Sequence, residues 1–176
     1  MILPRVVLLF AAAFSLGGCA GYHLGPIKPK LFENVNTVAV NTFKNDTLEP
    51  RIEVSFANAV IKQIQQDGTY RVVREEQADA LIEGTIIEIE RRPVRSVRGN
   101  VLATREFELI IRARYRVTER ATGRELDSRT VQGRTNFFVS GTDSICADTQ
   151  QDERQAIPQA TEELAVRLVS QISEGW

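Results

Sequence analysis

The sequence predicts an α+β fold: a two-layer sandwich in which two helices cover one face of a mainly antiparallel four-stranded sheet. The elements follow the order β-α-β-β-β-α, which lacks the βαβαβ alternation of a doubly wound sheet. Two stretches carry apolar residues at helical spacing, and one strand alternates apolar and polar residues over its whole length. A chain of 176 residues has room for one hydrophobic core, so a single domain is expected.

The N-terminus has the three regions of a signal peptide: a positive charge, the apolar run Val6–Phe14, and small residues after it. The run is too short to cross a bilayer, which takes about 20 residues. We therefore expect residues 1–18 to be a signal peptide and residues 19–34, which carry Gly, Pro and Lys without any period, to be a tether. Residues 35–176 are expected to form the domain.

The end of this leader, Leu16-Gly17-Gly18-Cys19, resembles the lipobox of bacterial lipoproteins. The resemblance implies a diacylglyceryl and an N-acyl lipid on Cys19, with no other cofactor, and two or three acyl chains anchor a protein firmly. By resemblance to the enterobacterial sorting pattern, Ala20 favours the periplasmic side of the outer membrane. Cys146 cannot pair with a lipidated Cys19, so it is expected to be buried and inert or to reach another chain.

The first strand and the first helix of the domain are predicted from two periods. Alternation over residues 37–43 predicts a strand, and Pro50 suits the first turn of the helix that follows. That helix ends at Asp67-Gly68, where glycine can form a left-handed cap. The strand should bury Val38, Val40 and Phe43, and the helix should bury Ile52, Phe56, Val60 and Ile64, flanked by Ala59 and Val54.

Three further strands and a second helix complete the predicted fold. Residues 70–73 suit a short edge strand or the entry to the first of these strands, which covers residues 80–90 with a bend or bulge at Gly84. In the third long strand, one face carries Phe107, Leu109, Ile111, Ala113, Tyr115 and Val117, and the other carries Glu108, Ile110, Arg112, Arg114, Arg116 and Thr118. A turn at 121–123 leads into the last strand, 125–139. In the final helix, 150–174, Pro158 marks the first turn or a kink, and the stripe is Ile157, Thr161, Leu164, Leu168 and Ile172.

Charge is concentrated in one part of the chain. The net charge of the whole chain is −1, which argues against a nucleic-acid partner, but residues 91–134 hold twelve arginines and five acidic residues. Arginine suits bidentate recognition of carboxylate or phosphate. We therefore predict an open, arginine-rich sheet face that includes Arg112, Arg114 and Arg116 and is covered by another molecule. The alternative is that these arginines only decorate a solvated strand face.

The sequence offers little material for catalysis. It has one histidine and two cysteines, no Gly-rich phosphate loop, no His–Glu metal spacing and no serine in a nucleophile elbow. The carboxylates Glu88, Glu90, Glu106 and Glu108 follow strand alternation on a solvated face. We predict no catalytic residue, no metal site and no enzymatic activity.

Three segments after the lipobox resemble the LptE family of lipopolysaccharide-assembly lipoproteins. The start of the mature chain, Cys19-Ala20-Gly21-Tyr22-His23-Leu24, looks like that family's N-terminus. Residues 38–50, VAVNTFKNDTLEP, resemble its strand-to-helix signature, and residues 78–84, ADALIEG, resemble the entry to its second long strand. The three motifs occur in order along the mature chain.

The resemblance implies a lipoprotein that plugs the LptD β-barrel, helps it to fold and supports lipopolysaccharide insertion into the outer leaflet. Lipopolysaccharide itself is a candidate ligand. The matching basic contact is Arg98, with Arg95 as the near alternative. The segment that holds the family's second basic contact, here residues 140–153, has no Lys or Arg.

Two other functions remain open from the sequence. An outer-membrane lipoprotein that activates a peptidoglycan synthase would share the lipobox and size, and would carry a long tether across the periplasm. Here only about 15 residues precede the first strand, a reach of roughly 50 Å at most. A lipid-anchored hydrolase is the third hypothesis.

Overall fold

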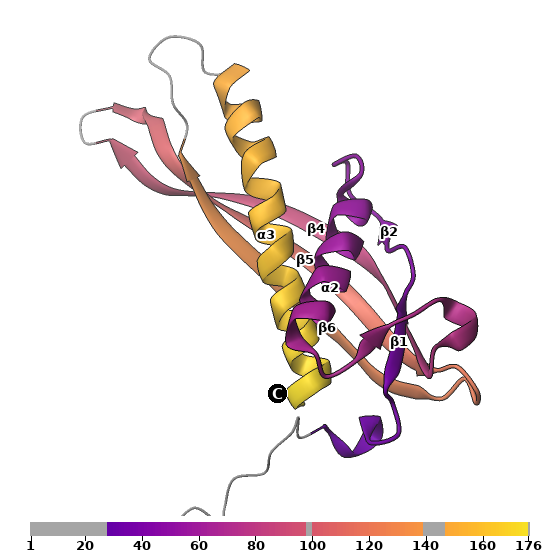
Figure 1. Cartoon of the computed structure of the whole chain (residues 1–176). Helices are drawn as coiled ribbons and strands as arrows, with labels where there is room; N and C mark the ends of the chain where they lie inside the picture. Colours follow the sequence, from indigo (N-terminus) through magenta and orange to yellow (C-terminus); the bar gives the residue numbers. More distant parts are fainter. Residues whose placement is uncertain (1–27, 98–99, 139–146, 176) are drawn as a thin grey trace, which may run out of the picture.

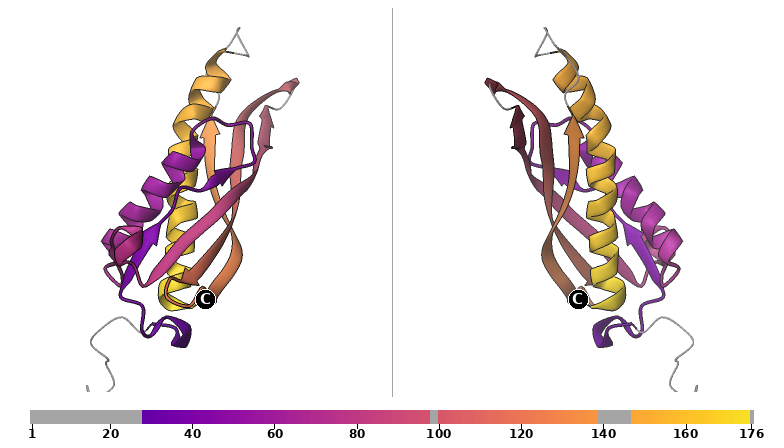
Figure 2. Two further views of the ribbon diagram at one scale, coloured as in Figure 1. Left: turned by 90° about the vertical axis from the view of Figure 1, so that its right-hand side faces the viewer. Right: turned by 90° about the vertical axis from the view of Figure 1, so that its left-hand side faces the viewer.

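The computed structural model describes residues 28–97, 100–138 and 147–175, with the side chains of 95–105 and 147–152 left out. A long twisted sheet forms one layer, and two helices lie side by side on one of its faces (Figures 1 and 2). The other face carries no helix among these residues. In the views of Figure 2 the helical layer and the sheet layer are seen edge-on.

The sheet has six strands in the order β3-β1-β4-β5-β6, with β2 also paired to β4. The helices are α2 (Ile52–Asp67) and α3 (Ala147–Glu174), and two 3-10 turns are η2 (Lys30–Phe32) and η3 (Glu75–Gln77). The strands are β1 (Thr37–Val40), β2 (Lys44–Asn45), β3 (Arg71–Val72), β4 (Ala80–Val97), β5 (Asn100–Glu119) and β6 (Glu125–Phe138).

The α+β class and the two helices on one face are confirmed, but the prediction of a mainly antiparallel four-stranded sheet is wrong. β4, β5 and β6 are antiparallel, whereas β1 runs parallel to both β3 and β4, and β2 runs parallel to β4. The cause is α2, which carries the chain from β1 over the sheet to β3, because a crossover helix returns the chain in the same direction. β3 lies within the short edge strand expected at residues 70–73, and β2, which has two residues, was not expected.

The alternation predicted for β5 is confirmed. Leu109, Ile111, Ala113, Tyr115 and Val117 face the helices and are fully buried. Ile110 belongs to the opposite face and is nevertheless only 5% exposed. The hairpin of β4 and β5 is longer than predicted, and it extends past the helical layer at one end of the molecule (Figure 1).

Both predicted helical stripes pack into the core. Ile52, Phe56, Val60 and Ile64 of α2 are at most 1% exposed, and so are Thr161, Leu164, Leu168 and Ile172 of α3. Two details differ from expectation. Val54 is 43% exposed, because it lies on the solvent side of α2, and Pro158 lies well inside α3, which begins at Ala147.

Two glycines mark close approaches between the layers. A Cβ at Gly133 would lie 2.2 Å from the backbone oxygen of Ala160, so α3 rests directly on the β6 backbone there. A Cβ at Gly84 would lie 2.9 Å from the ring of Phe43, which packs over it and against Phe56. The bulge predicted at Gly84 is displaced: the register shifts between Ile86 and Glu88.

The last residues of the predicted tether lie against the domain. Phe32 in η2 is 3% exposed, and the Lys28 ammonium donates to the backbone oxygen of Val35 at 2.6 Å and lies 5.3 Å from the centre of the Tyr70 ring. Tyr70 in turn donates its hydroxyl to the backbone oxygen of Ile172 in α3. The chain therefore enters the domain at the end opposite the β4–β5 hairpin.

At that same end, Asp79 joins the start of β1 to the start of β4. Its carboxylate accepts hydrogen bonds from the backbone amides of Asn36 and Thr37, at 3.0 and 2.9 Å, and from the Thr37 hydroxyl at 2.8 Å. These hydrogen bonds lower the pKa of Asp79 below its ordinary value, and the bond from the Asn36 amide has the largest effect.

We expect Asp79→Asn to lower the free energy of unfolding at neutral pH by about 1 kcal/mol. A buried charge-assisted hydrogen bond would contribute more, but the Asp79 carboxylate is exposed to solvent. Since the folded pKa is depressed, this contribution is present above the unfolded pKa and is lost as pH falls through the folded pKa. Denaturant titrations across the acidic range should therefore show the two proteins converging at low pH. A constant difference at every pH would contradict the assignment.

Candidate interaction face of the sheet

The sheet face away from the helices is built by alternate residues of β4, β5 and β6. Cross-strand pairing places Glu88 beside Arg112 and Arg92 beside Glu108, and β6 adds Arg134 on the far side of Ile110. Directly opposed residues on one face lie about 5 Å apart at Cβ, so opposite charges in such positions can meet. We call this surface the open face.

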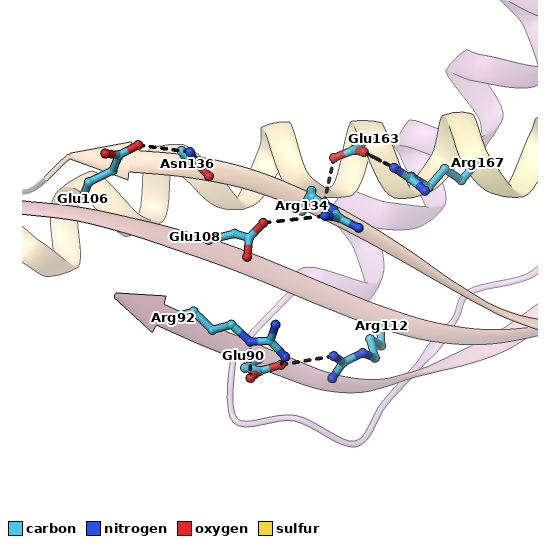
Figure 3. A network of polar contacts seen from close by, with 9 residues as sticks. All are labelled: Glu90, Arg92, Glu106, Glu108, Arg112, Arg134, Asn136, Glu163 and Arg167. Carbon is cyan, nitrogen blue, oxygen red and sulfur yellow. Dashed lines mark hydrogen bonds and ion pairs between the residues drawn. The ribbon is translucent and has the colours of Figure 1, made fainter. Parts of the chain in front are cut away.

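A first cluster of charges joins β4 to β5. Arg112 donates to the carboxylate of Glu88. Arg112 also donates to Glu90 at 3.1 Å, and Arg92 donates to Glu90 at 2.6 and 2.9 Å (Figure 3). The hydrogen bond from Arg92, followed by the bond from Arg112, lowers the pKa of Glu90 below its ordinary value. The hydrogen bond to Glu88 raises the pKa of Arg112. The ion pairs therefore favour the charged forms of Glu90 and Arg112.

A second cluster runs from β5 across β6 to α3. The Arg134 guanidinium lies 3.9 Å from Glu108, while its backbone amide donates to Glu163 of α3 at 2.7 Å. Glu163 also accepts from Arg167 at 2.8 Å, so the cluster continues around the outer strand to the helix (Figure 3). Because β6 is the last strand of the sheet, this carboxylate satisfies an edge amide that a further strand could otherwise bind.

The predicted arginines have different surroundings. Arg112 is ion-paired as described, and Arg116 lies 2.9 Å from Glu125. The Arg114 guanidinium has no hydrogen bond or ion pair with any residue that the structure describes. The backbone of Arg95 pairs with Glu106 near the end of β4, without a described side chain. Arg98, Cys19 and Cys146 lie outside the described residues, so their predicted roles remain predictions.

Sequence reasoning missed how far the open face neutralises itself. Strand alternation alone predicts only a solvated face for Glu88 and Glu90. The signal for ion pairs is that acidic residues two apart on one strand can face arginines two apart on the neighbouring strand. Glu163 could not be found in this way, because nothing in the sequence brings α3 to the edge of β6. Lys44 was missed because β2, the strand that adds it to the sheet, has only two residues and shows no period.

Within the described residues, no group of three or more His, Cys, Asp or Glu side chains is arranged to hold a metal ion. None of the described helices combines the length and the apolar character needed to cross a membrane. The candidate site is thus a surface of paired charges.

Comparison with solved structures gives the same fold in several bacterial proteins at low sequence identity. The PelC dodecamer from Paraburkholderia phytofirmans matches with a TM-score of 0.51 at 14% identity, over 85% of this chain and 94% of that one. The solution structure of lipoprotein B from Nitrosomonas europaea matches with a TM-score of 0.53 at 18% identity, over 88% and 92%. A minor lipoprotein from Acinetobacter baumannii matches with a TM-score of 0.50 at 15% identity, over 80% and 92%. No curated protein sequence matches.

The fold defines the class: a two-layer α+β domain that also occurs in bacterial lipoproteins. A model of the LptE family, described as lipopolysaccharide-assembly, matches residues 35–172. The chain therefore belongs to the LptE lipopolysaccharide-assembly family, as its motifs predict. This membership gives the protein a role in lipopolysaccharide assembly and is consistent with the predicted absence of enzymatic activity.

Proposed function

We propose that this protein is an outer-membrane lipoprotein, acylated at Cys19 on the periplasmic side, that occupies an LptD-type β-barrel. In this role it plugs the barrel, assists its folding and supports lipopolysaccharide insertion into the outer leaflet. The observation that carries the proposal is the LptE family match over 35–172, on a chain whose described part leaves one face of the sheet without a helix.

The chemistry of the open face supports a polar partner. A large membrane barrel has a polar interior, and the ion pairs of the open face suit such a wall better than a lipid or an apolar groove. Side chains such as those of Glu90 and Arg112, 30% and 26% exposed, are already held in place by each other. A partner surface can therefore cover them without first ordering them.

The dimensions of the domain also support this proposal. The 18 residues of β4 span about 60 Å at about 3.3 Å per residue, and the 28 residues of α3 span about 42 Å at about 1.5 Å per residue. A bilayer with its headgroups is about 40–45 Å thick. The long axis of the domain is therefore sufficient to run through a barrel from one side of the membrane to the other.

The short tether favours a partner in the same membrane. From Cys19 to Lys28, where the chain packs against the domain, the extended length is at most about 30 Å. An activator of a peptidoglycan synthase, the alternative function, would have to reach away from the membrane. Our proposal therefore places the domain beside its anchor.

Cross-linking in intact cells followed by purification of the acylated protein from outer membranes tests the proposal. We expect a large β-barrel as the main cross-linked protein, and we expect depletion of this lipoprotein to leave that barrel misfolded. A synthase in place of the barrel, with the barrel folding normally after depletion, would support the alternative.

The hairpin arginines give a separate prediction about lipopolysaccharide. Changing Arg95 and Arg98 together to Glu should weaken lipopolysaccharide binding by about tenfold or more, because two cations are replaced by anions at the predicted contact. The measurement is binding of labelled lipopolysaccharide to the purified full chain. The matched control changes Arg71 and Arg74 to Glu, two exposed arginines at the opposite end of the sheet. Equal weakening by both pairs would indicate general charge attraction and contradict the contact.

A further inference from the structure

A groove of about 470 Å³ lies on the open face near the start of β4, toward the end of the sheet away from the β4–β5 hairpin. Its floor is formed by β4 and β5, and one wall is the segment that joins β1 to β2. Its lining includes three residues with hydroxyl groups, Thr42, Thr85 and Ser128, and the charged residues Lys44, Glu83, Arg114 and Arg116. Small-molecule pockets in proteins have volumes of about 300–1,000 Å³, so the groove is of that size.

The sheet register places two of these cations on one rung. Lys44 of β2 pairs with Thr85 of β4, and Thr85 pairs with Arg114 of β5. Paired residues point to the same face, and two strand spacings separate the outer backbones by about 10 Å. Lys44 and Arg114 have long side chains, so both can reach an anionic group held over Thr85 between them.

These two cations differ from the others on the open face. Arg92, Arg112, Arg116 and Arg134 each have a carboxylate partner. Neither the Lys44 ammonium nor the Arg114 guanidinium has an ion-pair or hydrogen-bond partner among the described residues. Two uncompensated cations in one groove repel each other, and an anion bound between them removes that repulsion.

We propose that this groove binds an anionic saccharide. The phosphate or carboxylate of the ligand lies between Lys44 and Arg114, and its hydroxyl groups bond to Thr42, Thr85 and Ser128. Glu83, on the next rung, accepts from a further sugar hydroxyl. This hydroxyl-rich lining favours a sugar over a bare inorganic anion, and the single facing carboxylate disfavours a ligand of high negative charge. All of the residues that form the site belong to this chain.

Titration of the purified acylated chain in detergent tests the site, with glucose 6-phosphate and glucuronate as the two probes. Glucose and inorganic phosphate are the partial ligands. We expect one or both anionic sugars to bind at least about tenfold more tightly than either partial ligand, and the better probe identifies phosphate or carboxylate as the recognised group.

Substitutions then locate the binding. Arg114→Gln and Lys44→Gln should each weaken the better probe by about tenfold, whereas Arg112→Gln, an ion-paired arginine two residues along β5, should not. Circular dichroism checks that each variant is folded. The proposal is overturned if neither sugar binds, if inorganic phosphate binds as tightly as the sugars, or if Arg112→Gln weakens binding as much as Arg114→Gln.

Discussion

Ile111→Asp is expected to unfold the domain. The Ile111 side chain is fully buried under α3, between Ile89 of β4 and Gly133 of β6. An aspartate there loses the packing of a large aliphatic side chain and buries a carboxylate without a partner, at a cost of about 4 kcal/mol or more. Single domains are stable by only about 5–15 kcal/mol, so a large part of the stability is lost. Thermal unfolding followed by circular dichroism measures the loss.

Arg112→Ala is the matched control, because the two residues are adjacent and point to opposite faces. Arg112 lies on the open face and bonds to Glu88 and Glu90 near solvent, so its removal should lower the melting temperature only slightly. Equal losses in the two variants would show that the faces of β5 are assigned the wrong way round.

Cys19→Ala is expected to release the protein from the membrane fraction. Without the thiol no diacylglyceryl group can be attached, and two or three acyl chains are what makes anchoring firm. The variant should be found in the periplasm, soluble or with its signal retained, and fractionation followed by immunoblotting measures the change. Substitution of Cys146 by Ala is the control for loss of a thiol and should leave the protein in the membrane. Mass spectrometry of the wild-type N-terminus that showed an unmodified Cys19 would contradict lipidation.

The elements with a clear period could be predicted, and those without one could not. The stripes of α2 and α3 and the alternation of β5 follow from apolar residues that repeat over several turns or pleats. β3 lies within the short edge strand expected at residues 70–73, whereas β2 was not expected, and two residues in either strand are too few to show which way it pairs. For this reason the parallel half of the sheet was missed.

The open face was predicted in outline, and its charge balance was not. Strand alternation was enough to place Arg112, Arg114 and Arg116 together on one side of the sheet. Whether an arginine is paired depends on the residue opposite it, and that depends on a register which shifts at the bulge between Ile86 and Glu88. Arg112 gains two carboxylates in this way, whereas Arg114 lies opposite Thr85.

Site-specific photo-cross-linking in living cells tests the central claim, that the open face lies against a membrane barrel. A photoreactive residue at Gln132, in β6 on the open face, is compared with one at Val166, an exposed position on α3. We predict a cross-link from Gln132 to a large outer-membrane β-barrel, and a weaker one or none from Val166. A barrel cross-link from Val166 with none from Gln132, or no barrel from either position, would contradict the claim.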